Sequence, residues 1–272
     1  MKIIKTIKEL QEIRKNLKGS IGFVPTMGAL HKGHISLIKK SREENNIVVV
    51  SIFVNPTQFL EGEDLDAYPR KDEEDKKICE EYGVDYLFMP DVATMYEKEE
   101  VLVKAPNKSY VLEGYTRPGH FDGVLQVVLK LFNLVRPTNA YFGKKDAQQL
   151  VLIQQMVRNL FLPINIIPCE IVRENDGLAL SSRNVYLDNK QRQKSLLISK
   201  SLYLAKDLID KNELDFENIK AKMNEIMKDL NIEYIKLVNK DFKEIKKIEL
   251  NNSIILIVVR FGNTRLLDNI WI

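Results

Sequence analysis

Short apolar runs alternate with helical stripes along the first 170 residues. A run at Ile21–Val24 is followed by apolar residues that recur at helical spacing between positions 35 and 41. The next run, Ile47–Val54, is rich in β-branched residues and nearly unbroken, which is typical of a strand buried on both faces of a parallel sheet. A strand, a helix and a second strand within about thirty residues predict a βαβ unit.

The same alternation continues on both sides of this unit. Thr6 precedes a helical stripe over 6–18, and Glu9 three residues later completes the pattern of a capping box. Residues 61–75 hold many acids and indicate an exposed connection. The later pattern predicts a helix near 72–82, a strand at Val84–Met89, a buried helix at Val124–Val135, a strand and helix around Gly143, and a strand near 164–172.

The pattern changes after residue 171. Two amphipathic, lysine-rich helices are expected over 188–210 and 214–230, followed by strands at 233–238, 253–260 and 264–270. Helices followed by a run of strands are typical of a small α+β domain. We therefore expect two domains, residues 1–171 and residues 172–272.

Composition narrows the class of protein. The 272 residues are 44% hydrophobic and 29% charged, with a net charge of +3, an ordinary balance that does not favour nucleic acid or a membrane surface as a partner. Cys79 and Cys169 are too few for a disulfide framework, and a reducing cytoplasm is expected. No run approaches the roughly 18 apolar residues of a membrane span, and Met1–Thr6 lacks a signal core.

Candidate chemistry begins in the turn after the first apolar run. His31 and His34 are two of only three histidines in the chain, and they stand one helical turn apart at a helix start. Gly28 and Gly33 allow the backbone to approach a ligand, and the amides of a helix start, which lack internal partners, favour anions. The motif indicates a nucleotide-phosphate cradle of the His-x-Gly-His kind; the alternative is a pair of surface histidines.

Polar residues also follow the other strands. Asn55 to Gln58 follow the second strand, where α/β sheets bind ligands, although a plain Asn-Pro turn would explain them. A glycine-rich loop carries Arg117 and His120, either as a binding loop or as an ordinary turn. After Gly143, Lys145 could reach phosphate oxygens. Asp146 could cap a helix or hold a metal ion, and Gln149 lies one turn onward.

Five ordered motifs and the C-terminal segment resemble the pantothenate synthetase family, also called pantoate–β-alanine ligases. The matching segments are Val24–His34, Val54–Phe59, Arg117–Phe121, Phe142–Asp146 with Gln148 and Gln149, Asp176–Asn184, and Arg265–Asn269. The resemblance covers the whole length. It implies a Rossmann-like parallel sheet of the His-x-Gly-His nucleotidyltransferase type, with a smaller α+β C-terminal domain acting as a lid. It also implies a cytoplasmic homodimer.

The resemblance further implies an ATP-dependent ligase that joins pantoate to β-alanine with Mg²⁺. Pantoyl adenylate would be the intermediate, and AMP and pyrophosphate would be released. By resemblance, His31, His34 and Lys145 are catalytic, with His34 marked as proton donor. Pantoate would be held by Gln58, Gln149 and Asn55, and Mg²⁺ by Asp146. The residues implied to bind ATP are Met27, Gly28, Ala29, Leu30, His31, Lys32, Gly33, His34, Gly143, Lys144, Lys145, Asp146, Val172, Leu180, Ser181, Ser182 and Arg183.

Three positions depart from the family pattern. Lys144 stands where an acid is usual, Ala147 where an aromatic residue is common, and Leu180 where methionine is frequent. These changes are expected to alter packing near the nucleotide more than the chemistry.

Two other functions are compatible with parts of the pattern. One is another His-x-Gly-His nucleotidyltransferase that acts on a phosphate ester, and the Asn55–Phe59 segment together with Gln149 argues against it. The other is a nucleotide-binding module without catalysis, which three intact phosphate-contact segments disfavour.

Overall fold

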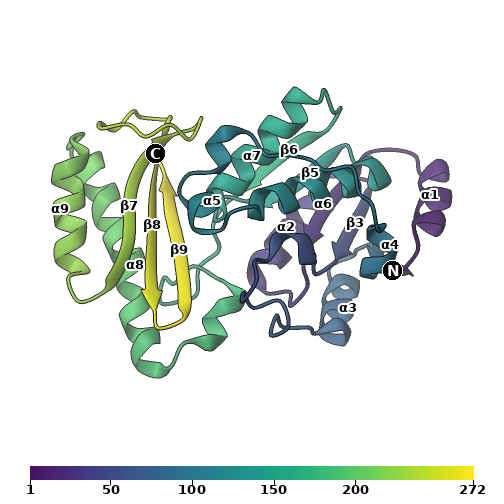
Figure 1. Cartoon of the computed structure of the whole chain (residues 1–272), viewed down its shortest axis with the longest axis horizontal. Helices are drawn as coiled ribbons and strands as arrows, with labels where there is room; N and C mark the ends of the chain where they lie inside the picture. The colour runs from purple at the N-terminus through teal and green to yellow at the C-terminus, as the bar shows by residue number, and fades with distance from the viewer. The chain divides into compact units, whose positions relative to one another are not determined.

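The chain folds around two separate sheets, one parallel and one antiparallel, in a computed structural model that describes residues 1–272 (Figure 1). One unit comprises Met1–Lys144 and Gln148–Glu170, and the other comprises Lys145–Ala147 and Ile171–Ile272. The short segment Lys145–Ala147 therefore groups with the C-terminal part of the chain, although it lies far before it in sequence.

The first unit contains six parallel strands in the order β1-β4-β3-β2-β5-β6. Every neighbouring pair is parallel, which confirms the predicted fold class. The order reverses beside β2, where β3 lies on one side and β5 on the other. The strands are β1 (Lys2–Ile4), β2 (Ile21–Thr26), β3 (Ile47–Ile52), β4 (Tyr86–Phe88), β5 (Asn139–Gly143) and β6 (Asn165–Cys169).

Helices connect these strands, and their apolar stripes cover the sheet. The α-helices are α1 (Ile7–Asn16), α2 (Lys32–Glu44), α3 (Asp72–Glu81), α4 (Val92–Met95), α5 (Glu113–Thr116), α6 (His120–Val135) and α7 (Ala147–Asn159). Two 3₁₀ turns, η1 (Pro56–Gln58) and η2 (Asn107–Ser109), lie between them. The predicted Val124–Val135 helix begins earlier, at His120, and its apolar residues are largely buried.

The start of α1 differs in one detail from the prediction. The Thr6 side chain accepts a hydrogen bond from the Glu9 amide at 3.2 Å, as expected for a helix cap. The Glu9 carboxylate instead forms an ion pair with Lys2 at 3.0 Å. The reciprocal half of the predicted capping box is therefore replaced by a contact to β1.

The second unit packs helices on an antiparallel sheet. The strands β7 (Asn231–Asn239), β8 (Ser253–Phe261) and β9 (Thr264–Trp271) lie in sequence order. The 3₁₀ turn η3 (Ser182–Tyr186) precedes α8 (Asn189–Asp210) and α9 (Phe216–Ile226). Alternate residues of β8, including Ile255, Ile257 and Val259, face the apolar stripes of the two helices in one buried cluster.

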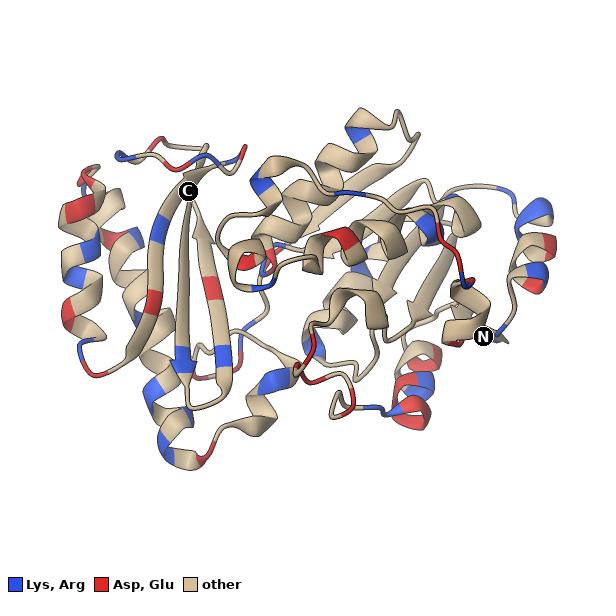
Figure 2. Cartoon of the chain, in the orientation of Figure 1, with Lys and Arg blue, Asp and Glu red and all other residues tan.

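Charged residues of both signs are scattered over both units, without a large patch of one sign on the ribbon (Figure 2). None of the helices is long and apolar enough to cross a lipid bilayer.

Candidate active site

Three polar segments follow the carboxyl ends of three neighbouring strands. The histidine motif follows β2, the Asn55–Gln58 segment follows β3, and Gly143 ends β5. Because β3, β2 and β5 are adjacent and parallel, these segments leave the sheet at the same edge. The strand order reverses at this position, and open α/β sheets bind ligands at such a reversal.

A strained turn opens the histidine motif. Gly28 and Ala29 both have left-handed backbones, with φ of +86° and +50°. The amides of Ala29 and Leu30 donate to the Asp75 carboxylate at 2.8 and 2.7 Å. The amide of Gly28 donates to the Thr26 hydroxyl at 3.2 Å. These three amides therefore have partners within the protein, and the turn presents side chains rather than these N–H groups to a ligand.

The two motif histidines cap the helix that they begin. The amide of Gly33 donates to His31 Nδ1 at 3.1 Å, and the amide of His31 donates to His34 Nδ1 at 3.3 Å. The amide of Gly33, at the start of the helix, is therefore satisfied by a capping side chain rather than left open to an anion. Because each Nδ1 accepts a hydrogen bond, the pattern assigns the proton of each neutral ring to Nε2. The rings lie 4.2 Å apart between centroids and can act as paired Nε2–H donors.

The side chain of Gln58 contacts the histidine-motif turn. Its amide nitrogen lies 3.0 Å from the Met27 sulfur, and its amide oxygen accepts from Asn55 Nδ2 at 3.1 Å. Asn55 is 1% exposed and also accepts from the Tyr96 hydroxyl at 2.7 Å. Asn55 therefore supports Gln58, and its assignment to pantoate stays a prediction.

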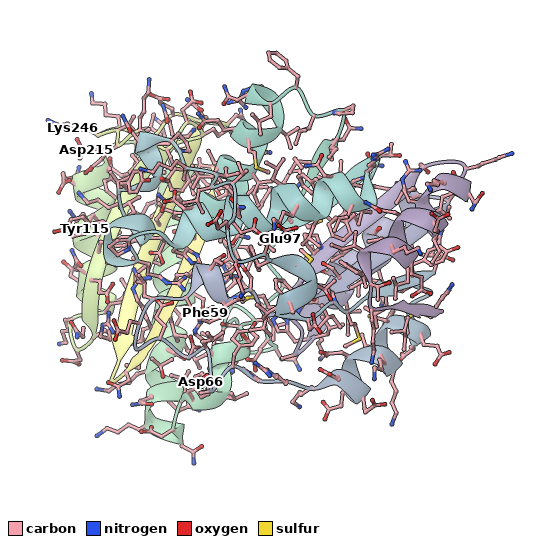
Figure 3. The ribbon with its side chains drawn as sticks, turned by 45° about the vertical axis from the view of Figure 1, so that its right-hand side comes forward. Phe59, Asp66, Glu97, Tyr115, Asp215 and Lys246 are labelled. Carbon is pink, nitrogen blue, oxygen red and sulfur yellow. The ribbon has the colours of Figure 1, made fainter.

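The same segment lies directly against helix α6. A Cβ atom added to Gly123 would come within 2.3 Å of the Thr57 carbonyl oxygen. Asn55 Nδ2 also donates to the Gly123 carbonyl at 3.1 Å. Glycine at this position therefore permits the close approach. After Gln58, the ring of Phe59 (Figure 3) packs edge-on against Tyr68 at 5.9 Å between centroids.

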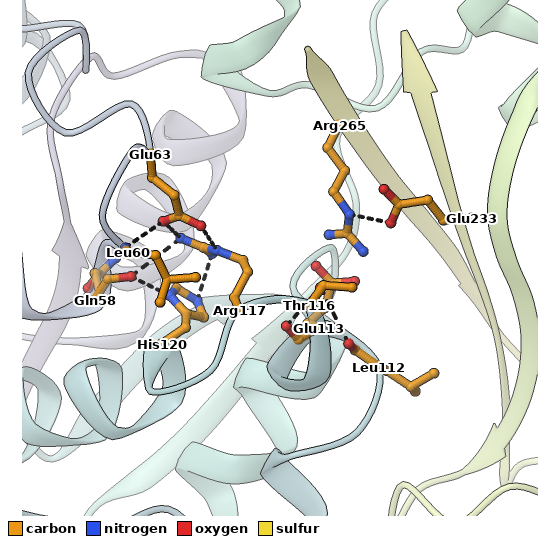
Figure 4. Close-up of polar contacts among 10 residues, drawn as sticks. All are labelled: Gln58, Leu60, Glu63, Leu112, Glu113, Thr116, Arg117, His120, Glu233 and Arg265. Carbon is orange, nitrogen blue, oxygen red and sulfur yellow. Dashed lines mark hydrogen bonds and ion pairs between the residues drawn. The ribbon is translucent and has the colours of Figure 1, made fainter. Parts of the chain in front are cut away.

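Arg117 and His120 hold the backbone of Gln58 (Figure 4). His120 Nδ1 donates to the Gln58 carbonyl at 2.7 Å, and Arg117 Nη1 lies 3.0 Å from His120 Nε2. Arg117 also binds Glu63 through two nitrogens, both at 2.6 Å. Burial favours the neutral Glu63 carboxyl, but Arg117 outweighs this effect and holds the pKa of Glu63 below its ordinary value.

Several segments expected to bind phosphates belong to the second unit. The carbonyl of Lys145 accepts from Asn269 Nδ2 at 2.7 Å, which ties this segment to β9. The neighbouring Asp268 binds Arg173 through two hydrogen bonds at 2.6 and 3.0 Å. Lys144 belongs to the first unit, where its ammonium group pairs with Glu170. The last strand of the chain thus anchors two loops.

The loop around Ser181–Arg183 is closed by its own hydrogen bonds. The Leu180 amide donates to the Val172 carbonyl at 3.0 Å, which closes a hairpin. The Ser181 hydroxyl accepts from the Arg183 amide at 3.3 Å and caps η3. This capping bond leaves the hydroxyl proton of Ser181 available as a donor.

The two glutamines of α7 differ in their surroundings. Gln148 is buried, and its amide group bonds to the carbonyls of Lys108 and Val111 at 3.1 and 2.9 Å. Its oxygen accepts from the Glu113 amide at 3.1 Å. Gln148 therefore supports the loop before α6. Gln149 is half-buried in the first turn of α7, the helix that follows β5 in the chain.

The acidic groups do not form a cation cage. The chain has no cluster of three or more His, Cys, Asp or Glu residues arranged to hold a metal ion. Asp146 has a half-exposed side chain, 3.7 Å from the Lys145 ammonium group. Mg²⁺ is commonly held by one or two carboxylates together with substrate phosphates. One carboxylate near a lysine that is expected to contact phosphate fits a metal ion that is bound mainly by the nucleotide.

Two supporting carboxylates, Asp75 and Glu63, lie in the stretch 61–75 that the sequence predicts to be an exposed connection. This prediction was wrong for both carboxylates and for Tyr68, which is 7% exposed. Asp75 stands four residues before the buried Cys79 on α3. That spacing places both residues on one helical face. The position of Asp75 on the same face as an apolar cysteine is the sequence signal that could have identified it as a buried acid.

The sequence and the fold both match known proteins over their full length. The model of the family described as pantoate-beta-alanine ligase matches residues 2–271. A pantothenate synthetase of Aliarcobacter butzleri is 70% identical over 272 residues, and one of Campylobacter hominis is 56% identical over 273. Each comparison covers 100% of both chains.

Two solved structures have the same fold. The pantothenate synthetase of Thermus thermophilus is 38% identical with a TM-score of 0.94, covering 100% of this chain and 99% of that one. The pantoate-beta-alanine ligase of Francisella tularensis, complexed with beta-gamma ATP and beta-alanine, is 39% identical with a TM-score of 0.82. That comparison covers 100% of this chain and 97% of the other.

Proposed function

The chain belongs to the pantoate–β-alanine ligase family, and we propose that it activates pantoate at the edge of the sheet where β2, β3 and β5 end. It is an ATP-dependent ligase that condenses pantoate with β-alanine. The observation that carries the proposed site is the contact between Gln58, assigned to pantoate, and Met27 in the histidine turn. Acid and nucleotide would then lie side by side.

The reaction must bring two anions together. In the first step, a carboxylate oxygen of pantoate attacks the α-phosphorus of ATP, and the bond to pyrophosphate breaks. In the second, the amine of β-alanine attacks the carbonyl carbon of pantoyl adenylate, loses a proton and displaces AMP. Positioning the reactants and stabilising the developing charge lower the barrier of the first step.

The residues of the first unit suit these tasks. Gln58 and Gln149 would bind pantoate through neutral amides, which orient the acid without neutralising its attacking carboxylate. His31 and His34 would donate hydrogen bonds from Nε2 to the phosphates. This arrangement is supported by the backbone amides that occupy both Nδ1 atoms. It favours a hydrogen-bonding role for His34 over proton donation, because a neutral ring is a very weak acid at Nε2.

The second unit would supply positive charge for the leaving pyrophosphate. Lys145, Ser182 and Arg183 are assigned to the phosphates, with Ser181 as a further hydroxyl donor. Asp146 would hold Mg²⁺, which screens the negative charge of the triphosphate when it is bound. The remaining nucleotide contacts are assigned to the backbone and side chains of Met27–Leu30, Lys32, Gly33, Gly143, Lys144, Val172 and Leu180.

Two properties of the whole protein complete the proposal. We assign the C-terminal domain expected from the sequence, residues 172–272, the role of a lid, and the protein the form of a homodimer, both on the family resemblance. A cytoplasmic location is supported by the two free thiols, since Cys79 and Cys169 are both buried and unpaired and a reducing compartment keeps them so.

The experiment that tests the function follows AMP release from ATP, Mg²⁺ and pantoate, with and without β-alanine. The ligase is expected to turn over only when both acids are present. In a single turnover without β-alanine, pantoyl adenylate and pyrophosphate should form. Release of AMP that ignores β-alanine, or transfer of AMP to a phosphate ester instead of pantoate, would contradict the proposal.

A further inference from the structure

A single buried carboxylate holds the turn that carries the histidine motif. We propose that Asp75 is a positioning residue for ATP. In this role it fixes the left-handed backbone of Gly28 and Ala29 and so places His31 and His34 for the phosphates. The inference rests on the proposed use of both histidines. It assigns a role to a residue outside all the motifs that identify the family here.

The conformation of the turn needs a partner outside itself. Ala29 has φ of +50°, a region that a side chain with a Cβ atom disfavours. Such backbone strain persists only where the surroundings impose it. The surroundings here are the two oxygens of Asp75, which accept from Ala29 and Leu30 at 2.8 and 2.7 Å. Two consecutive amides are therefore fixed in direction by one side chain.

The carboxylate that does this is in a costly environment. Asp75 is 1% exposed, and both of its oxygens bond to backbone amides rather than to a lysine or arginine. Burial raises the pKa of Asp75, and the two amide bonds oppose that effect. The carboxylate lies in the first turn of α3, where the helix dipole favours a negative charge. A buried anion without a cation is expensive to keep, which is consistent with a need for this particular turn geometry.

We call the pair of hydrogen bonds from the Ala29 and Leu30 amides to Asp75 the clamp. The clamp is next to the proposed phosphate donors in the chain. Leu30, whose amide binds Asp75, is followed at once by His31, whose amide binds His34 Nδ1. A rotation of the Leu30 peptide therefore changes the position of the His31 amide and, with it, the ring that this amide holds. Displacements of about 1 Å in a reacting group can reduce a rate by about a hundredfold.

Asp75→Asn tests the clamp with a side chain of the same size. Asparagine keeps one acceptor oxygen, but its NH₂ group would face a backbone N–H that needs an acceptor. We expect single-turnover formation of pantoyl adenylate to fall by about tenfold to a hundredfold, with an unchanged KM for β-alanine in the second step. The matched control is Asp72→Asn on the exposed side of the same helix turn, which should keep the wild-type rate.

Ala29→Gly separates positioning from a general loss of stability. Glycine adopts the left-handed region without the Cβ penalty, so it should need the clamp less. In the Asp75→Asn protein, we expect Ala29→Gly to raise the adenylation rate. This change in rate should be several-fold larger than the change that Ala29→Gly causes in the wild-type protein. If Asp75→Asn does not fold, Gly28→Ala tests the same contact, since its Cβ would lie 3.0 Å from Asp75 Oδ2, and the same loss of adenylation is expected.

The outcomes distinguish the clamp from the site that it serves. A wild-type adenylation rate in both Asp75→Asn and Gly28→Ala, with His34→Ala inactive, would overturn the role of Asp75 and leave the histidines in place. A wild-type rate in His34→Ala would overturn the proposed site itself. Equal effects of Ala29→Gly with and without Asp75 would show that the carboxylate does not support the turn, which also overturns the inference.

Discussion

The two units hold the segments proposed to bind phosphate in opposite ways. In the first unit, the histidine turn donates backbone amides to a buried carboxylate, Asp75, and to the ring nitrogens of its own histidines. In the second unit, the Lys145 segment offers a backbone carbonyl to the amide of Asn269. The histidine turn is thus held through its N–H donors by a residue of helix α3. The Lys145 segment is held through a carbonyl acceptor by a residue of β9, the last strand of the chain.

This difference has a consequence for the electrostatics of each segment. The partner of the turn in the first unit is a carboxylate, Asp75, and the neighbouring rings are assigned hydrogen-bond donation from Nε2 because each Nδ1 accepts a backbone amide. The support in the second unit is the uncharged amide of Asn269, which binds the backbone of Lys145 and leaves its side chain for the proposed contact with phosphate. A direct hydrogen bond and a full charge respond differently to substitution and to salt, and the following variants use that difference.

The largest effect is expected from removing the two proposed donors themselves. His34→Ala and Lys145→Ala should each lower the rate of adenylate formation by about a hundredfold or more, the scale for a lost transition-state donor. Single-turnover measurement with ATP and pantoate checks both. Lys145→Arg keeps the charge and should retain more activity than Lys145→Ala. Unchanged adenylation in both alanine variants would remove these residues from the mechanism.

Asp268→Asn removes the carboxylate of the ion pair between Arg173 and Asp268 in the second unit. Arg173 would keep its charge but lose a carboxylate that is 3% exposed. The free energy of unfolding is expected to fall by about 2–3 kcal/mol, the scale for hydrogen bonds to charged groups. Urea denaturation measures it. Asp241→Asn, at an exposed position of the same unit, is the control, and equal midpoints for the two variants would contradict the expectation.

Asn269→Ala removes the donor that binds the Lys145 carbonyl. The adenylation rate is expected to fall by about tenfold, because a hydrogen bond of about 1 kcal/mol is lost and a partly buried carbonyl loses its donor. The side chain of Lys145 remains, so salt should weaken ATP binding in this variant as in the wild type. A rate equal to that of the wild type would mean that β9 does not position Lys145.

The smallest effect is expected from Glu63→Gln, which should change how the stability of the first unit depends on pH. The folded-state pKa of Glu63 lies below its ordinary value of 4.5 because Arg117 outweighs the effect of burial. Its ionised form therefore stabilises the fold above pH 4.5, and this contribution is lost as the pH falls through the lower, folded value. Denaturant midpoints from pH 7 to 3 should decline less in Glu63→Gln. A parallel decline in both proteins would exclude this contribution.

Much of the fold was predictable because its signals are local. The β-branched run that forms β3 and the apolar stripe of α6 define elements by composition and periodicity alone. The histidine motif was found because histidine is scarce in the chain. The reciprocal capping of the two rings was not foreseen, since it depends on the backbone directions of the turn rather than on residue types.

The supporting residues were harder to find because they act across long sequence separations. Asp75 binds a turn 45 residues earlier, and Asn269 binds a carbonyl 124 residues earlier. A single sequence contains no periodicity that links such pairs. The acid-rich sequence around Glu63 predicts solvent exposure, because charged clusters are usually exposed. Only the folded chain reveals that Arg117 covers this carboxylate.

The contact between Gly123 and Thr57 limits how the proposed pantoate site can be redesigned. Because α6 touches the Thr57 carbonyl without an intervening side chain, the Gln58 segment has no space to retreat into. A variant enzyme intended for a bulkier acid cannot gain room on that side by trimming residues, since glycine is already the smallest. Room has to come from another neighbour of Gln58, such as the flexible Met27 thioether that contacts its amide.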